Sequence, residues 1–143
     1  MRRIPILMIV MAIGAACGDA PVAESTTCSA EPKLFCEPFV DLASKLSDED
    51  KSFLANATGE DLIMLHHGFG TGVRNEYGLW KENALTQFFR AQGVEHPDDM
   101  SGHFICGLSK WLRKEPTDMV QIIAGEPRCE YTIEVDIPEE VPK

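Results

Sequence analysis

The sequence predicts a mainly α-helical, single-domain bundle of four to six helices, stabilised by disulfides and ending in a short strand or an extended arm. Three observations support this fold class. Apolar residues recur at i, i+3, i+4 spacing through much of the chain between residues 38 and 114. Residue types that favour helix starts precede several of these segments. The chain of 143 residues has room for one domain of ordinary size.

Residues 1–16 have the composition of an export signal. Arg2 and Arg3 precede an apolar run that is too short to span a bilayer, which takes roughly 20 apolar residues. The stretch Ile13–Cys17 resembles the lipobox of bacterial lipoproteins, in which the Cys is acylated and becomes the first residue of the mature chain. We therefore expect Cys17 to anchor the protein in the cell envelope, facing the periplasm or the exterior. The alternative is cleavage after Ala20 and a soluble secreted protein.

The charge of the chain excludes one class of partner. Removal of residues 1–16 takes away two arginines and no acid, which leaves 11 basic and 23 acidic side chains and a net charge of −12. Such a chain repels phosphate backbones, so we expect no nucleic-acid partner. The membrane, through the lipid on Cys17, is the first expected partner, and a protein or a small anionic ligand is the second.

The cysteine count indicates disulfides. With Cys17 assigned to the lipid, an even number of cysteines remains in an exported chain, which favours two bridges among Cys28, Cys36, Cys106 and Cys129. The sequence does not choose among the three pairings of these four cysteines.

Cys106 has a distinctive position on its predicted helix. In a helix over about residues 97–114 it lies nearly opposite the apolar face made by Met100, Phe104, Leu108 and Trp111. We therefore expect a disulfide from Cys106 to hold one of the flanking cysteines against the back of this helix.

The first helices follow a polar segment. Residues 17–36 are rich in Ala, Pro, Glu, Ser and Thr and are expected to form a tether, followed by the helical domain over residues 37–114. From Pro38 the pattern becomes helical. Ser47 is expected to cap a second helix over about Asp48–Asn56, with acids in its first turn where the helix dipole favours them.

One long helix is expected after Thr58. Its apolar positions recur over four turns from Leu62 to Tyr77. Gly68, Gly70 and Gly72 interrupt it, and each costs roughly 0.5–1 kcal/mol against Ala inside a helix. Either a neighbouring backbone packs closely there, or the helix is distorted around Gly68–Gly72.

Helix-capping residues and an alternation of apolar and polar residues predict the remaining elements. Asn83 is expected to cap a helix that ends before Gly93, and His96-Pro97 begins the next helix. Residues 115–143 are expected to form an acidic C-terminal arm, with a short helix at Asp118–Ala124 and a strand at residues 131–137.

Several short motifs lie between residues 37 and 113: Leu65-His66, Arg74-Asn75, Leu79-Trp80 and the run His96-Pro97-Asp98-Asp99-Met100-Ser101-Gly102. With these motifs, about half of the chain resembles a family of short bacterial domains of unknown function. The resemblance implies a helical fold and no activity.

The candidate ligand-binding residues gather around a glycine notch. His67, Gly70 and Arg74 share one helix stripe, and the space over Gly70 could receive a carboxylate or phosphate bound bidentately by Arg74. The alternative is structural: Arg74 pairs internally with Asp98 or Asp99, and Asn75 and His66 satisfy buried backbone groups. The full candidate set is His66, His67, Arg74, Asn75, Trp80, Asp98 and Asp99.

An enzyme is the less favoured class. A small periplasmic hydrolase would use His66 or His67 with Asp98-Asp99, but Ser101 lacks a nucleophile-elbow motif. The chain has no close Cys or His pair of the kind that structural zinc needs, so we expect neither a metal nor a cofactor. The sequence therefore predicts a non-catalytic binding or interaction module at the cell envelope.

Overall fold

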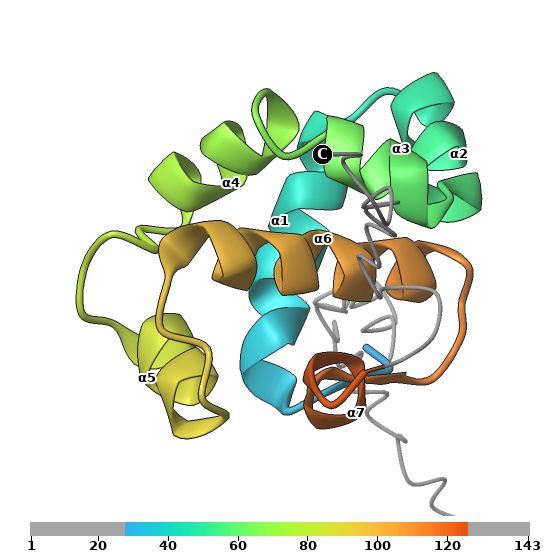
Figure 1. The fold of residues 1–143 in the computed structure, drawn as a ribbon. Coiled ribbons are helices and arrows are strands. Elements are labelled where there is room, and N and C mark those ends of the chain that lie inside the picture. Colours follow the sequence, from blue (N-terminus) through green and yellow to red (C-terminus); the bar gives the residue numbers. More distant parts are fainter. Residues whose placement is uncertain (1–27, 126–143) are drawn as a thin grey trace, which may run out of the picture.

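The computed structural model describes residues 28–125. The predictions for the export signal, Cys17, Cys129 and the strand at residues 131–137 lie outside the described residues. The part that is described is mainly helical, as the sequence predicts, with one 3₁₀ helix (η1), seven α-helices and two short strands (Figure 1). In chain order these are β1 (Ala30–Glu31), η1 (Lys33–Phe35), α1 (Cys36–Lys45), α2 (Asp48–Asn56), α3 (Gly59–Met64), α4 (Phe69–Glu76), α5 (Ala84–Ala91), α6 (Pro97–Leu112), β2 (Thr117–Asp118) and α7 (Met119–Ile123).

Helix α6 is the centre of the domain. It crosses the middle of the molecule, with the other helices arranged around it (Figure 1), and it contacts α2, α3, α4, α5 and α7. Its predicted apolar face is buried, and Ile105 and Cys106 on other faces are buried as well. A helix that is covered on all sides is a core helix, so α6 supplies the surface on which the rest of the chain folds.

Gly107 allows α6 to be covered so closely. A Cβ at this position would collide with Met119 Sδ of α7 and would lie 3.0 Å from Phe39 Cζ of α1. The hydrogen of Gly107 is therefore what leaves room for two elements from opposite ends of the domain.

The local signals for helix starts are confirmed. Ser47 and Asn83 each form a capping box, in which the side chain accepts from the N3 backbone amide while the N3 side chain accepts from the cap's own amide. His96 caps α6 with Pro97 in its first turn, and Asp118 caps α7. Gly93 follows α5 with φ +82°, a left-handed conformation that favours glycine after a helix.

The predicted continuous helix from Thr58 to Tyr77 is wrong. It is two helices, because α3 ends at Met64 and α4 begins at Phe69. Both structural effects expected of the glycines occur. Gly68 stands at the break as the N-cap of α4, and Gly70 is in close contact, since a Cβ there would lie 3.2 Å from Arg74 Nη1.

The predicted domain boundaries at residues 37 and 114 are too narrow. Residues 28–36 were expected to belong to the tether, but Ala30 and Phe35 are fully buried and β1 pairs in parallel with β2. Phe35 lies against four aromatic rings, those of Phe39, Phe88, Phe89 and Phe104. At the other end Met119 and Ile122 are buried, so the segment assigned to the acidic arm also contributes to the core.

The structure shows that three cysteines of the described residues form disulfides. Cys28 bonds to Cys36, with their Cα atoms 5.7 Å apart. Cys106 is also disulfide-bonded, as predicted. Among the described helices, none is long and apolar enough to cross a membrane.

Candidate functional site

Arg74 is a buried cation at the junction of α4 and the start of α6. Only 5% of its surface is exposed. Its Nη1 donates to Ser101 Oγ at 2.9 Å and to the His66 carbonyl oxygen at 3.4 Å, and its Nη2 donates to Thr71 Oγ1 at 2.9 Å. A clamp on a ligand carboxylate would need these same donors, so the guanidinium is committed to the protein itself.

Asp98 supplies the counter-charge for Arg74. Arg74 Nε lies 3.1 Å from Asp98 Oδ1, a distance that makes an ion pair, although the angle at this nitrogen does not make a hydrogen bond. Two imidazoles flank the same carboxylate, because His66 Nε2 and His96 Nδ1 each lie 3.7 Å from Asp98 Oδ2. The internal pairing expected as the alternative for Arg74 is therefore present.

The candidate residues from the sequence divide into two groups. The structure brings His66, Arg74, Trp80 and Asp98 together, with the Arg74 guanidinium 6.0 Å from the centre of the Trp80 ring system. His67 is exposed and touches this group only through the edge of the His66 ring.

Asn75 and Asp99 are exposed and supply none of the Arg74 contacts. Asp99 instead acts on His103, whose pKa is lowered by burial and partly restored by that carboxylate. The expectation that Asn75 satisfies a buried backbone group is therefore wrong, since its side chain points to solvent.

The arrangement does not form a hydrolytic centre. Ser101 is fully buried, and its hydroxyl donates to the Asp98 carbonyl oxygen at 2.8 Å while it accepts from Arg74. A nucleophile needs its proton directed at a base, and here that proton is held by a backbone carbonyl. Within residues 28–125 no group of three or more His, Cys, Asp or Glu side chains could hold a metal ion.

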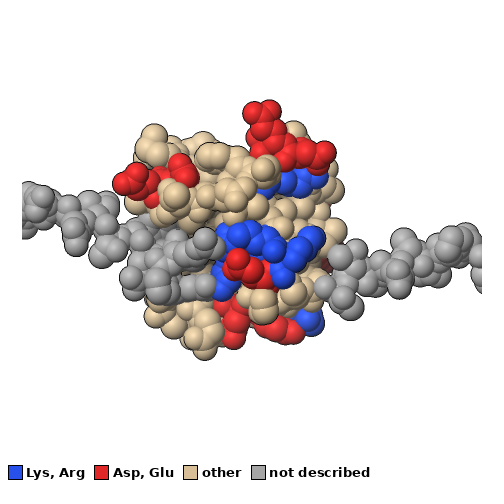
Figure 2. All heavy atoms as spheres, turned by 90° about the vertical axis from the view of Figure 1, so that its right-hand side faces the viewer, with Lys and Arg blue, Asp and Glu red and all other residues tan. Residues whose placement is uncertain are grey.

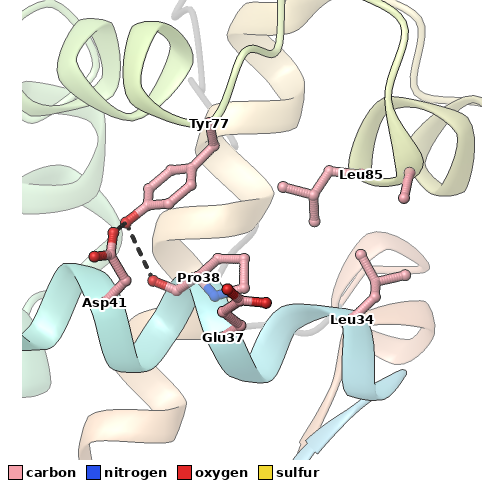
Figure 3. A pocket seen from close by; sticks show the side chains of 7 residues that line it. Leu34, Glu37, Pro38, Asp41, Tyr77 and Leu85 are labelled. Carbon is pink, nitrogen blue, oxygen red and sulfur yellow. Dashed lines mark hydrogen bonds between the residues drawn. The ribbon is translucent and has the colours of Figure 1, made fainter.

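An open hollow lies on another side of the domain, where α1 meets the start of α5 and Tyr77 (Figure 3). Its volume is about 390 Å³. We name it the Tyr77 pocket, and its lining residues are Leu34, Glu37, Pro38, Asp41, Tyr77, Ala84 and Leu85.

Tyr77 is a rigid wall of this pocket. Its ring stacks on Phe104 of the core, with ring centres 5.1 Å apart and planes at 24°. Its hydroxyl lies 2.8 Å from Asp41 Oδ2 and 3.2 Å from the Pro38 carbonyl oxygen (Figure 3). Burial raises the pKa of Tyr77, and the Asp41 carboxylate raises it further, so the phenol stays neutral.

The two carboxylates of the pocket differ. Asp41 is compensated, because hydrogen bonds from Lys45 and Tyr77 lower its pKa, and Lys45 also pairs with Glu76. Glu37 is exposed, and within the described part of the chain it makes no hydrogen bond or ion pair. The mouth of an apolar hollow therefore carries one uncompensated negative charge.

Residues 31–112 match the family described as a domain of unknown function, DUF6794. The chain belongs to this family. No curated protein and no solved structure matches it. The DUF6794 match contains His66, Arg74, Trp80 and Asp98 as well as every residue that lines the Tyr77 pocket. The elements β2 and α7 lie beyond the end of the match.

Sequence reasoning placed Tyr77 on the apolar stripe but did not find the pocket. Besides Tyr77, the walls of the pocket come from η1, α1 and α5. The first and last lining residues, Leu34 and Leu85, are 51 positions apart in the sequence. One signal was available: a tyrosine on an otherwise apolar stripe needs a partner for its hydroxyl, and Asp41 is that partner.

Proposed function

We propose that this protein is an envelope-anchored lipoprotein whose DUF6794 domain is a non-catalytic binding module. In this proposal the Tyr77 pocket takes a basic side chain of a partner protein, together with an apolar neighbour. The observation that carries it is the unpaired carboxylate of Glu37 at the mouth of an apolar, rigidly walled pocket.

The chemistry of the pocket matches the side chain of Lys or Arg. Leu34, Pro38 and Leu85 provide apolar surface, on which the methylene stem of such a side chain can pack. The charged head then reaches Glu37 at the rim. A volume of about 390 Å³ lies within the usual range for pockets that enclose small groups, roughly 300–1,000 Å³.

The charge of the whole chain favours the same class of partner. A net charge of −10 attracts basic partners over a distance and repels acidic ones. Among the lining carboxylates, Asp41 already has two donors, so Glu37 is the group that gains most from a new cation.

Binding is tested with short peptides. Nitrogen-15 spectra of the protein are recorded with acetyl-Leu-Lys-Leu-amide and, as the matched probe, acetyl-Leu-Glu-Leu-amide. We expect shifts at Leu34, Tyr77 and Leu85 with the lysine peptide only. Glu37→Gln should weaken this binding by about fivefold, the value of one partly exposed charge pair, and Glu49→Gln on exposed α2 should leave it unchanged.

Two outcomes would overturn the binding proposal. Equal shifts with both peptides would remove the role of charge, and lysine-peptide shifts confined to other surfaces would remove the role of the pocket.

The anchor is tested separately in cells. Wild-type protein should sediment with membranes after osmotic lysis, and Cys17→Ser should lose its acyl chains as measured by mass spectrometry. An unacylated wild-type chain would overturn the anchor and leave the peptide experiment unaffected.

A further inference from the structure

A second hollow also borders α1. Its volume is about 520 Å³, and it runs between α1, α2 and the C-terminal end of α6. We name it the Trp111 groove, and its lining residues are Val40, Ala43, Ser44, Lys51, Trp111, Leu112 and Lys114. The groove and the Tyr77 pocket share no lining residue.

The groove has an apolar floor and a cationic rim. Val40 is 49% exposed, so its apolar side chain is accessible from outside the domain. Lys114 Nζ lies 5.2 Å from the centre of the Trp111 ring system. Lys51 Nζ pairs with Asp48, but that carboxylate is fully exposed, and an exposed pair contributes little and is readily exchanged.

Basic side chains gather on one end of this acidic protein. Figure 2 looks onto the end where α2 and the C-terminus of α6 lie, and Lys and Arg side chains gather around the middle of that face, with Asp and Glu side chains among and around them. Arg113 is already engaged by Glu115 and by the Ala55 carbonyl oxygen, so Lys51 and Lys114 are the cations that face the groove.

The groove lies beside the point where the N-terminal segment joins the domain. The Thr117 amide donates to the Ser29 carbonyl oxygen at 3.3 Å, and Ser29 Oγ donates to the Glu115 carbonyl oxygen at 3.4 Å. Glu115 directly follows Lys114. Cys17 lies 11 positions before Cys28, so a lipid on Cys17 would tether this end of the domain within about 40 Å of the bilayer.

We propose that the Trp111 groove binds the anionic headgroups of the membrane that carries the protein. Lys51 and Lys114 contact the lipid phosphates, while the exposed Val40 meets the glycerol region above Trp111, which is 8% exposed and belongs to the floor of the groove. The inference rests on the proposed envelope location, but it does not require the lipid for its test.

The test uses the two tryptophans as reporters of position. The chain has two Trp, of which Trp111 lines the groove and Trp80 lies beside Arg74. Residues 18–143, which contain the whole described domain, are exported behind a cleavable leader so that no lipid is attached. Vesicles of phosphatidylcholine, with or without phosphatidylglycerol, carry bromine on their acyl chains as a short-range quencher.

The expected result separates the two ends of the molecule. In a Trp80→Phe background, Trp111 fluorescence should be quenched by vesicles that contain phosphatidylglycerol, and added salt should reverse the quenching. In a Trp111→Phe background, Trp80 should not be quenched. Lys51→Gln with Lys114→Gln should lower vesicle partitioning by about 30-fold, or about fivefold for each lysine at an anionic surface.

Three results would overturn the proposal. These are quenching of Trp80 to the same extent as Trp111, quenching that does not depend on phosphatidylglycerol, and an equal loss of partitioning in the matched control Lys81→Gln near Trp80. A response of Trp111 to inorganic phosphate without any response to vesicles would make the groove a soluble-anion site and would also overturn it. None of these results affects the peptide experiment at the Tyr77 pocket.

Discussion

Replacing Asp98 by Asn should destabilise the domain by about 2 kcal/mol, and the reason is the burial of its partner. The Arg74 side chain is 7% exposed and the Asp98 side chain 35% exposed. Removing one partner of a fully buried pair costs about 3–5 kcal/mol because it leaves a buried charge without compensation. Here water reaches the carboxylate, and Ser101 and Thr71 keep their contacts with the guanidinium, so the lower figure of about 2 kcal/mol applies.

Asp99→Asn is the matched control for this experiment. Asp99 stands next to Asp98 in the same first turn of α6, so both variants lose a similar interaction with the helix dipole, about 0.5 kcal/mol. Asp99 is exposed and supplies no contact to Arg74. The difference between the two variants therefore reports the loss of the Asp98 contacts with Arg74, His66 and His96.

The measurement is urea unfolding followed by circular dichroism, with the disulfides intact. We expect Asp98→Asn to be less stable than Asp99→Asn by at least about 1 kcal/mol, at unchanged slope. If the two variants are equally stable, the pairing of Arg74 with Asp98 does not stabilise the domain and the reasoning is refuted.

The remaining predictions concern packing, protonation and the disulfides. Gly107→Ala should destabilise the domain by about 1–3 kcal/mol, because the added Cβ meets Met119 and Phe39. Gly72→Ala should be neutral or stabilising by up to about 1 kcal/mol, because nothing lies within 4 Å of the added Cβ. Thermal melts of both variants check this. Burial lowers the pKa of His103, so the unfolded chain binds a proton on this side chain more readily than the folded chain. The free energy of unfolding should therefore fall as the pH drops below about 6.5. In urea melts between pH 5 and pH 7, His103→Gln should reduce this dependence on pH, and the exposed control His67→Gln should not. Replacing Cys28 and Cys36 together by Ser should cost about 2.5 kcal/mol, since the bridge closes a loop with a sequence separation of 8. In non-reducing peptide maps Cys106 should resist alkylation, and a free Cys106 thiol would refute the second bridge.

The candidate site shows where reasoning from sequence succeeds and where it stops. The pairing of Arg74 with Asp98 was one of two open interpretations, because spacing alone shows that the two residues can meet and not which donors are used. Burial decided between them. Once α4 packs on α6, the guanidinium has only protein oxygens around it.

The sequence by itself determined the local structure of this protein. Ser47, Asn83, His96 and Asp118 begin helices at the predicted positions, because a cap is satisfied by amides two or three residues away and needs no distant partner. The mainly helical class follows from the same short-range periodicity.

Only the tertiary structure decided which segments join the core and where the hollows lie. Phe35 and Met119 come from segments that the sequence assigns to the tether and to the acidic arm, yet both are fully buried because α6 offers surface on all sides. The Tyr77 pocket and the Trp111 groove form between residues that are far apart along the chain. Such contacts depend on how helices pack, and periodicity within one helix carries no information about its neighbours.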